Sequence, residues 1–183
     1  MKTFCDLGTV RLETERLILR RFTVEDAPRV FDGWTGDDAC DSRCSWRVHP
    51  SADYTRDILA HWIDEYEDNA YNWLVEVKET HELIGNISTV SIKRKHGNCE
   101  IGYCYGSRFW GKGYATEALR RVVDFLLDDC HFHLVEAQHA AGNPASGRVM
   151  QKAGMRLDAV LPQRMYYAET DTFEDLFVYS IKR

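Results

Sequence analysis

The stretch from Arg108 to Leu119 constrains the fold of this chain more than any other part of its sequence. It places Gly111 and Gly113 one residue apart, directly after a segment at 100–105 that is typical of a strand. Apolar side chains then recur at helical spacing, at Ala115, Ala118, Leu119, Val122, Val123 and Leu126. Glycine tolerates positive φ and close approach, and a helix start presents unpaired N–H groups beside the positive end of its dipole. The order of strand, glycine loop and helix therefore predicts an anion site suited to phosphate, although two glycines alone would also suit a tight turn that caps a helix.

Two familiar phosphate-binding loops do not fit this stretch. A Walker loop requires the pattern Gly-x-x-x-x-Gly-Lys-Ser/Thr, which is absent here, and a dinucleotide loop requires a third glycine where Thr116 stands. A nucleotide-dependent oxidoreductase is therefore not predicted. The stretch does resemble the acetyl-CoA pyrophosphate loop of the GNAT superfamily of N-acetyltransferases, Gln/Arg-x-x-Gly-x-Gly/Ala, with Arg108, Gly111 and Gly113 at the fixed positions. The longer run 109–119 resembles the RimJ/RimL-type branch, which includes ribosomal-protein N-terminal acetyltransferases.

This resemblance implies the residues that bind the cofactor and protonate the leaving thiolate. In and around the loop they are Arg108, Trp110, Gly111, Lys112, Gly113, Tyr114 and Ala115. The segment 143–155 resembles the family's second cofactor motif, which implies that Asn143 hydrogen-bonds the cofactor arm. Many members use a tyrosine as the proton donor where Met150 stands, and in the RimJ/RimL branch a serine one turn earlier, here Ser146, takes that place. We therefore expect Ser146 to be catalytic, and the alternative is that it only caps or fills the first turn of a helix.

Glu100 is the candidate general base of the implied reaction. A terminal α-amine has a pKa near ~8, so a modest base suffices at neutral pH and no protein nucleophile is needed. Glu100 precedes the loop on a strand where the family places the acetyl group, and strand alternation puts it on one face with Gly102 and Cys104. The sequence leaves open whether it is a base or an exposed partner in a cross-strand ion pair. Backbone N–H groups of the same strand, Tyr103 among them, would polarise the thioester carbonyl.

Secondary-structure signals give the order β-α-α-β-β-β-α-β-α-β-β, which is a mixed α/β architecture. The predicted strands lie at 16–22, 71–78, 83–93, 98–105, 134–139, 155–159 and 173–181, and the predicted helices at 23–31, 52–69, 114–129 and 145–153. This order is similar to the GNAT fold, a mixed, mostly antiparallel sheet flanked by helices and splayed between its fourth and fifth strands to hold the pantetheine. The resemblance covers nearly the whole chain. We expect a single domain over 1–183, in which 1–15 form a flexible lead-in.

Composition restricts the class of protein and its partners. A chain of 183 residues suits one domain with a full core. There is no long apolar run or secretory start, so we expect no membrane span and, by default, a cytoplasmic protein. A formal net charge of −6 disfavours nucleic-acid binding and is compatible with an amine-bearing partner. The six cysteines are expected to be reduced, with Cys99 and Cys104 on opposite faces of one strand, and no metal site is predicted at Cys40, Cys44 and His49.

The irregular segment from Asp32 to Pro50 allows two interpretations, because its tryptophans could line a substrate entrance or pin a loop to the core. Taken together, the motifs predict an N-acetyltransferase that moves the acetyl group of acetyl-CoA, its co-substrate, directly to a primary amine. The acceptor would be a protein N-terminus or a small amine, and the enzyme a monomer or homodimer. The alternative is a non-catalytic acyl-CoA-binding or sensor module on the same fold, which turnover of acetyl-CoA with a panel of amines would separate.

Overall fold

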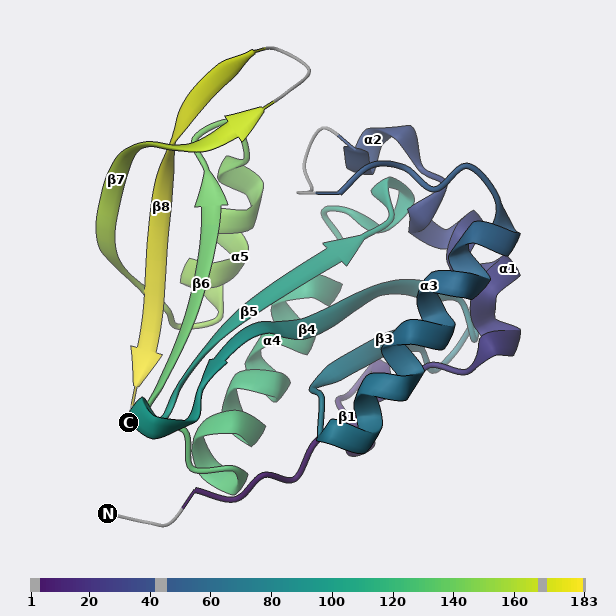
Figure 1. Ribbon diagram of the computed structural model, residues 1–183, viewed down its shortest axis with the longest axis horizontal. Helices are drawn as coiled ribbons and strands as arrows, with labels where there is room; N and C mark the ends of the chain where they lie inside the picture. Colours follow the sequence, from purple (N-terminus) through teal and green to yellow (C-terminus); the bar gives the residue numbers. More distant parts are fainter. Residues whose placement is uncertain (1–3, 42–45, 168–170, 183) are drawn as a thin grey trace.

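The computed structural model describes residues 4–41, 46–167 and 171–182, which form one sheet of eight strands with helices on both faces (Figure 1). The strand order across the sheet is β1-β2-β3-β4-β5-β6-β8-β7. The strands are β1 (Leu12–Glu13), β2 (Leu17–Arg20), β3 (Asn72–Val77), β4 (Leu83–Lys93), β5 (Asn98–Tyr105), β6 (Leu134–Ala140), β7 (Arg156–Tyr167) and β8 (Thr172–Lys182). The α-helices are α1 (Ala27–Val30), α2 (Asp38–Asp41), α3 (Ala52–Asp64), α4 (Tyr114–Asp124) and α5 (Pro144–Lys152). The predicted mixed α/β architecture is confirmed.

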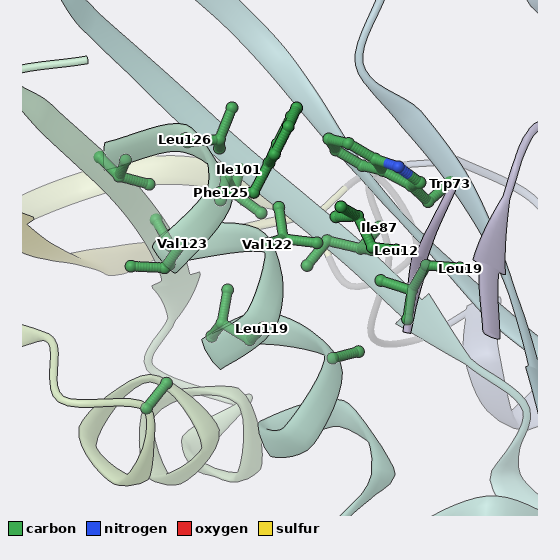
Figure 2. Packing of buried hydrophobic residues seen from close by; sticks show 14 of the residues in the cluster. Leu12, Leu19, Trp73, Ile87, Ile101, Leu119, Val122, Val123, Phe125 and Leu126 are labelled. Atoms are coloured by element: carbon green, nitrogen blue, oxygen red, sulfur yellow. The ribbon is translucent and has the colours of Figure 1, made fainter. Parts of the chain in front are cut away.

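The sheet separates two hydrophobic cores. Along β3, Trp73 and Val75 belong to the core beneath α4, whereas Leu74 belongs to the core beneath α1 and α3. A strand buried on both faces loses the polar alternation of a surface strand, which explains the continuous apolar run in this part of the sequence. Figure 2 shows the α4 side, where Leu119 and Val122 pack toward the sheet. Each large apolar side chain buried in this way contributes about 1.5–3 kcal/mol to folding.

The parallel pair β5 and β6 opens along its length. Their register runs from Asn98 opposite Leu134 to Ile101 opposite Ala137, and both strands continue beyond the last of these pairs. The remaining residues of β5, from Gly102 to Tyr105, still pair with β4. The predicted splay between the fourth and fifth strands is therefore confirmed. These two strands carry the labels β5 and β6 because the short strand β1 was not predicted.

The N-terminal segment differs from its prediction as a flexible lead-in, because residues 4–15 pack along the sheet. Leu12 is buried in β1, and Thr9 donates a 2.6 Å hydrogen bond to the Ala70 carbonyl while it accepts one of 2.7 Å from the Asn72 backbone. The backbone N–H of Leu7 donates to the Tyr71 hydroxyl. Periodicity could not reveal this, because single side chains anchor the segment to residues more than 60 positions away.

Strand β7 is longer than the predicted strand at 155–159. A proline stands at position 162, and proline cannot donate a backbone hydrogen bond to a ladder. The structure passes this position with a bulge between Leu161 and Met165, in which Gln163 has φ of 52° and donates its backbone N–H to Asp175 at 3.0 Å. The extended β7–β8 hairpin, at the upper left of Figure 1, rises beside the open end of the sheet.

Side-chain caps fix the starts of two helices near the site. Ser51 accepts a 3.2 Å hydrogen bond from the backbone of Tyr54 at the start of α3, and the Asn143 side chain accepts one of 3.3 Å from Ser146 at the start of α5. Gly154 ends α5 with φ of 96°. Within the described residues, no helix is both long and apolar enough to cross a membrane.

Candidate active site

The glycine loop after β5 adopts the conformation that its sequence predicts. Gly111 and Gly113 have φ of 75° and 83°, and Gly113 is the residue directly before α4. A Cβ on Gly111 would have no atom within 4 Å, so the loop presents open backbone rather than a packed turn. Positive φ at both glycines turns the chain into the helix, and the first-turn N–H groups of α4 lie at the end of this loop.

An ion pair holds the loop against the start of the sheet. The Arg16 guanidinium lies 2.6 Å from the Glu117 carboxylate and donates at 3.1 Å to the Lys112 carbonyl inside the loop. Burial alone would raise the pKa of Glu117, but hydrogen bonds from Thr14 and Arg16 hold it below its usual value. At the other end of the loop, the Trp110 indole donates to the Tyr105 carbonyl at 2.6 Å. The acidic side chain in the first turn of α4 is therefore paired away from the anion site.

A cavity of 270 Å³ extends from this loop along α5. Its lining includes eight of the predicted site residues: Tyr103, Trp110, Gly111, Gly113, Tyr114, Ala115, Asn143 and Ser146. Two other predicted residues, Arg108 and Lys112, do not line it, and their cations lie 4.7 and 5.4 Å from the centre of the Phe109 ring. The loop therefore lines the cavity with its glycine backbone and not with these two side chains, and its contact with a cofactor stays a prediction.

Two cations that the sequence reasoning missed line the same cavity. Arg148 and Lys152 lie one helical turn apart on α5, across from the glycine loop. Both cations lie within the segment 143–155, but the resemblance of this segment to the cofactor motif was used to assign roles only to Asn143 and Ser146. Open backbone at a helix start, facing two cations, suits the phosphates of a nucleotide-like cofactor.

Ser146 and Tyr103 form a pair of hydroxyl groups where the two halves of the sheet part. The Ser146 hydroxyl donates to the Tyr103 hydroxyl at 3.0 Å, and the Tyr103 hydroxyl donates to the Ser146 carbonyl at 3.1 Å. Burial raises the pKa of Tyr103, and its hydrogen bond with Ser146 opposes that rise, so the phenol stays protonated at neutral pH. The sequence singled out Tyr103 for its backbone N–H, whereas the structure places its side-chain hydroxyl beside the predicted catalytic serine.

A second, larger cavity of 1120 Å³ lies on the α3 side of the sheet and shares lining residues with the first, namely Tyr103, Cys104, Asn143 and Ser146. Its floor is polar and crosses four strands, with Asn72, Asn86, Ser88, Glu100 and Gln138 among its residues. Because one set of residues lines both cavities, a group held in the first can meet a group held in the second at the Ser146–Tyr103 pair.

The model of the acetyltransferase (GNAT) domain family matches residues 16–156 of the chain. The chain belongs to the GNAT acetyltransferase family. It is 31% identical to the uncharacterised N-acetyltransferase YoaA of Bacillus subtilis (strain 168), over 93% of this chain and 95% of that protein. Its identity to the ribosomal protein uS5-alanine N-acetyltransferase of Escherichia coli (strain K12) is 27%, over 79% and 77% of the two chains. It is an acetyl-CoA-dependent N-acetyltransferase, and the two cavities are the candidate sites of its two substrates.

Among solved structures, the fold resembles that of the microcin C7 self-immunity acetyltransferase MccE, which was determined in complex with acetyl-CoA and AMP. The TM-score is 0.83 at 18% sequence identity, and the match covers 93% of this chain and 94% of that one. At this identity the likeness concerns the fold, and it agrees with the splayed sheet described above.

Glu100 of the acetyltransferase lies half-buried in the floor of the larger cavity. Burial raises its pKa above the usual value; a hydrogen bond from Gln138 opposes this rise, the nearby Glu136 carboxylate adds to it, and Lys93 opposes it. Cys104 lies in the core on this face and Cys99 in the core on the other, so the predicted alternation along β5 is confirmed. A carboxylate with a raised pKa inside a cavity is a candidate for proton exchange with a ligand, and the role of Glu100 as a base stays a prediction.

The irregular segment after α1 is pinned to the core by a tryptophan, as one interpretation of its sequence expects, whereas its role as a substrate entrance stays a prediction. Trp34 is fully buried in the core beneath α1 and α3, whereas Trp46 lines the larger cavity together with the residues up to Pro50. Cys44 lies outside the described residues. Among the residues that the structure describes, no group of three or more His, Cys, Asp or Glu side chains is arranged to hold a metal ion.

Proposed function

We propose that this acetyltransferase acetylates the terminal amine of a polypeptide, bound in the larger cavity, with acetyl-CoA bound in the smaller one. The observation that carries the proposal is the volume of 1120 Å³, which exceeds the roughly 300–1,000 Å³ of an ordinary small-molecule site. Among its described lining residues, Glu65 and Glu100 supply the carboxylates and Arg47 adds a cation, which is a poor match for a polyamine that carries several positive charges. The relative that acetylates ribosomal protein uS5 supports a protein acceptor.

The cofactor cavity fits acetyl-CoA on its own features, because open glycine backbone, the start of α4 and the cations Arg148 and Lys152 converge on one site. We assign the phosphate contacts to Gly111, Gly113 and these cations. When bound, acetyl-CoA supplies the acetyl thioester whose carbonyl the amine attacks.

The chain's own residues handle the protons at the junction of the cavities. Glu100 accepts a proton from the acceptor nitrogen, and its raised pKa makes it a better base than an exposed carboxylate. Ser146 donates a proton to the departing sulfur, supported by the neighbouring Tyr103 hydroxyl. Met150 is on the buried face of α5 and its side chain has no proton to donate, which is consistent with Ser146 as the proton donor.

Acetyl-CoA consumption by the wild-type enzyme tests the acceptor class. The panel contains peptides with different N-terminal residues, the same peptides with acetylated N-termini, polyamines and aminoglycosides. We expect the highest kcat/KM on free peptide N-termini and none on the blocked controls. A preference for polyamines would contradict the proposal, and tight acetyl-CoA binding without turnover on any amine would favour the sensor module. We also propose that the enzyme is a single domain and that it is cytoplasmic.

A further inference from the structure

One wall of the larger cavity contains a histidine that the reaction described above does not use. His49 lies in the segment 46–50, half-buried, and its backbone N–H donates to the Thr35 carbonyl at 2.7 Å. Its ring packs between Trp46 and Tyr54, with ring centres 5.5 and 5.0 Å away. Backbone and ring contacts therefore fix the imidazole in the cavity wall.

Hydrogen bonding at Thr55 determines which ring nitrogen of His49 carries the proton. His49 Nδ1 lies 2.9 Å from the Thr55 hydroxyl, and Thr55 is fully buried. The same hydroxyl lies 3.2 Å from the Ser51 carbonyl and 3.1 Å from the Thr35 hydroxyl. A threonine hydroxyl has one hydrogen and two lone pairs. When that hydrogen goes to Ser51 or Thr35, a lone pair is left for His49 Nδ1–H, and Nε2 keeps its own lone pair unprotonated.

The surroundings keep this imidazole neutral. Burial holds the pKa of His49 below its usual value of 6.5. The charged groups that line the same cavity are Arg47 from its own segment, Glu65 after α3 and Glu100 on β5, with Tyr54 of α3 in contact with the ring. Arg47 disfavours a charged imidazole, whereas the two carboxylates favour it. At neutral pH the ring is therefore able to accept a proton.

We propose that His49 is a second proton acceptor of the acceptor cavity, with Thr55 as the positioning residue that fixes its tautomer. The inference rests on the proposed function. A protonated amine must lose two protons on its way to an amide: one before it can attack, and one after the N–C bond forms and the C–S bond breaks. His49 Nε2 takes the first from the ammonium group as it enters, and Glu100 takes the second. Of the two protons that leave the nitrogen, one is delivered to the sulfur and the other to solvent, so every proton is accounted for.

NMR of the enzyme labelled with ¹⁵N-histidine tests the tautomer without any acceptor. Long-range ¹H–¹⁵N spectra should show His49 neutral at pH 7 with its proton on Nδ1, the signal being assigned by its loss in His49→Gln. In Thr55→Val the preference for Nδ1–H should be lost, and in Thr55→Ser it should return. A proton on Nε2, or a charged ring at pH 7, overturns the assignment.

Kinetics with a peptide acceptor test the role of His49. His49→Gln should lower kcat/KM for the peptide by about 10-fold near pH 7, because only about a tenth of an amine with a pKa near ~8 is then free, and the loss should shrink as pH rises; KM for acetyl-CoA should stay unchanged. His96→Gln, at the exposed turn between β4 and β5, is the matched control and should behave as wild type. Thr55→Val should share part of the loss and Thr55→Ser should recover it.

The two sets of outcomes separate the inference from the proposed function. If wild type acetylates peptides and His49→Gln matches His96→Gln, the role of His49 is overturned and the proposed function stands. If wild type acetylates no peptide, the acceptor class is overturned, and with it the role of His49 in that reaction, while the NMR result still decides the tautomer.

Discussion

At the scale of single residues, the proposed chemistry depends on the pair formed by Ser146 and Tyr103. The Ser146 side chain is not the cap of α5. The backbone N–H of Ser146 donates to the Asn143 side chain, which is the cap, and the Ser146 hydroxyl donates to the Tyr103 hydroxyl. A serine needed only for the first helical turn would not require a buried phenol beside it. The contact joins residues 43 positions apart and supports the catalytic interpretation of Ser146.

Replacing Ser146 by alanine removes the proton donor that we propose for the departing sulfur. We expect kcat to fall by about 10²-fold, while affinity for acetyl-CoA stays within a small factor, because the cofactor contacts assigned above lie elsewhere. Tyr103→Phe should give a smaller loss, since it removes only the supporting hydroxyl. Steady-state kinetics with calorimetry check both variants. Full kcat in Ser146→Ala would transfer the role to Tyr103 or to a water molecule.

Replacing Glu100 by glutamine removes a proton acceptor and keeps its shape. If Glu100 takes the second of the two protons, kcat/KM should fall and stay low as pH rises, because a free amine must still lose a proton after it attacks. Partial recovery at high pH, where the free amine becomes abundant without help, would mean that Glu100 takes the first proton instead of His49. Burial raises the pKa of Glu100, so the wild-type rate should decline on the acid side at a pH above that of an ordinary glutamate. A pH–rate profile of variant and wild type is the measurement. A raised KM with constant kcat would instead mean that Glu100 binds the ammonium ion.

At the scale of elements, the glycine loop and α4 could be predicted from sequence because they obey local rules. Two glycines with positive φ, a strand before them and an apolar helical face after them need no information from elsewhere in the chain. The parts that the sequence did not reveal depend on distant contacts. Strand β1 is held by pairing with β2, and β7 passes Pro162 through a bulge that only its partner strand makes possible. Arg148, Lys152 and the His49–Thr55 contact are local in sequence and were missed for another reason, since only the fold shows which side of a segment lines a cavity.

Gly113→Val tests the loop as an element. Valine at φ of 83° is strained, and its Cβ would lie 3.4 Å from the Arg16 guanidinium, so the loop must move away from the position that presents its backbone to phosphate. We expect acetyl-CoA affinity to fall strongly while the fold survives. Gly97→Val, at φ of 64° in the turn between β4 and β5, imposes a similar strain far from the site and serves as the control. Calorimetric titration of folded protein decides, and equal affinity in both variants would remove the loop from the cofactor site.

At the scale of the whole molecule, the splayed sheet brings two cavities together. The smaller cavity lies against α4 and α5 and the larger cavity beneath α3, so in the proposed reaction the two substrates approach the Ser146–Tyr103 pair from different sides. This arrangement requires the α1–α3 layer to stay fixed to the sheet. Arg20 of β2 makes that connection, because its guanidinium forms two 2.8 Å hydrogen bonds with Asp26, before α1, and one of 3.2 Å with Glu76 on β3.

The Arg20 connection should make the stability of the molecule depend on pH. Burial alone would raise the pKa values of Asp26 and Glu76, but the hydrogen bonds from Arg20, Thr23 and His81 lower both below their usual values of 3.8 and 4.5. The unfolded chain therefore binds these protons first as pH falls. The stabilisation is complete above about pH 5 and is lost as pH falls through the folded-state pKa values. Asp26→Asn should lower the free energy of unfolding at pH 7 by about 3 kcal/mol, because Arg20 loses its main partner in a buried site, and should flatten the dependence of that free energy on pH below about pH 5. Asp53→Asn, whose carboxylate is 94% exposed, is the control and should leave both unchanged. Urea unfolding followed by tryptophan fluorescence at several pH values measures this, and parallel curves for Asp26→Asn and wild type would show that the ion pair does not fix the layer.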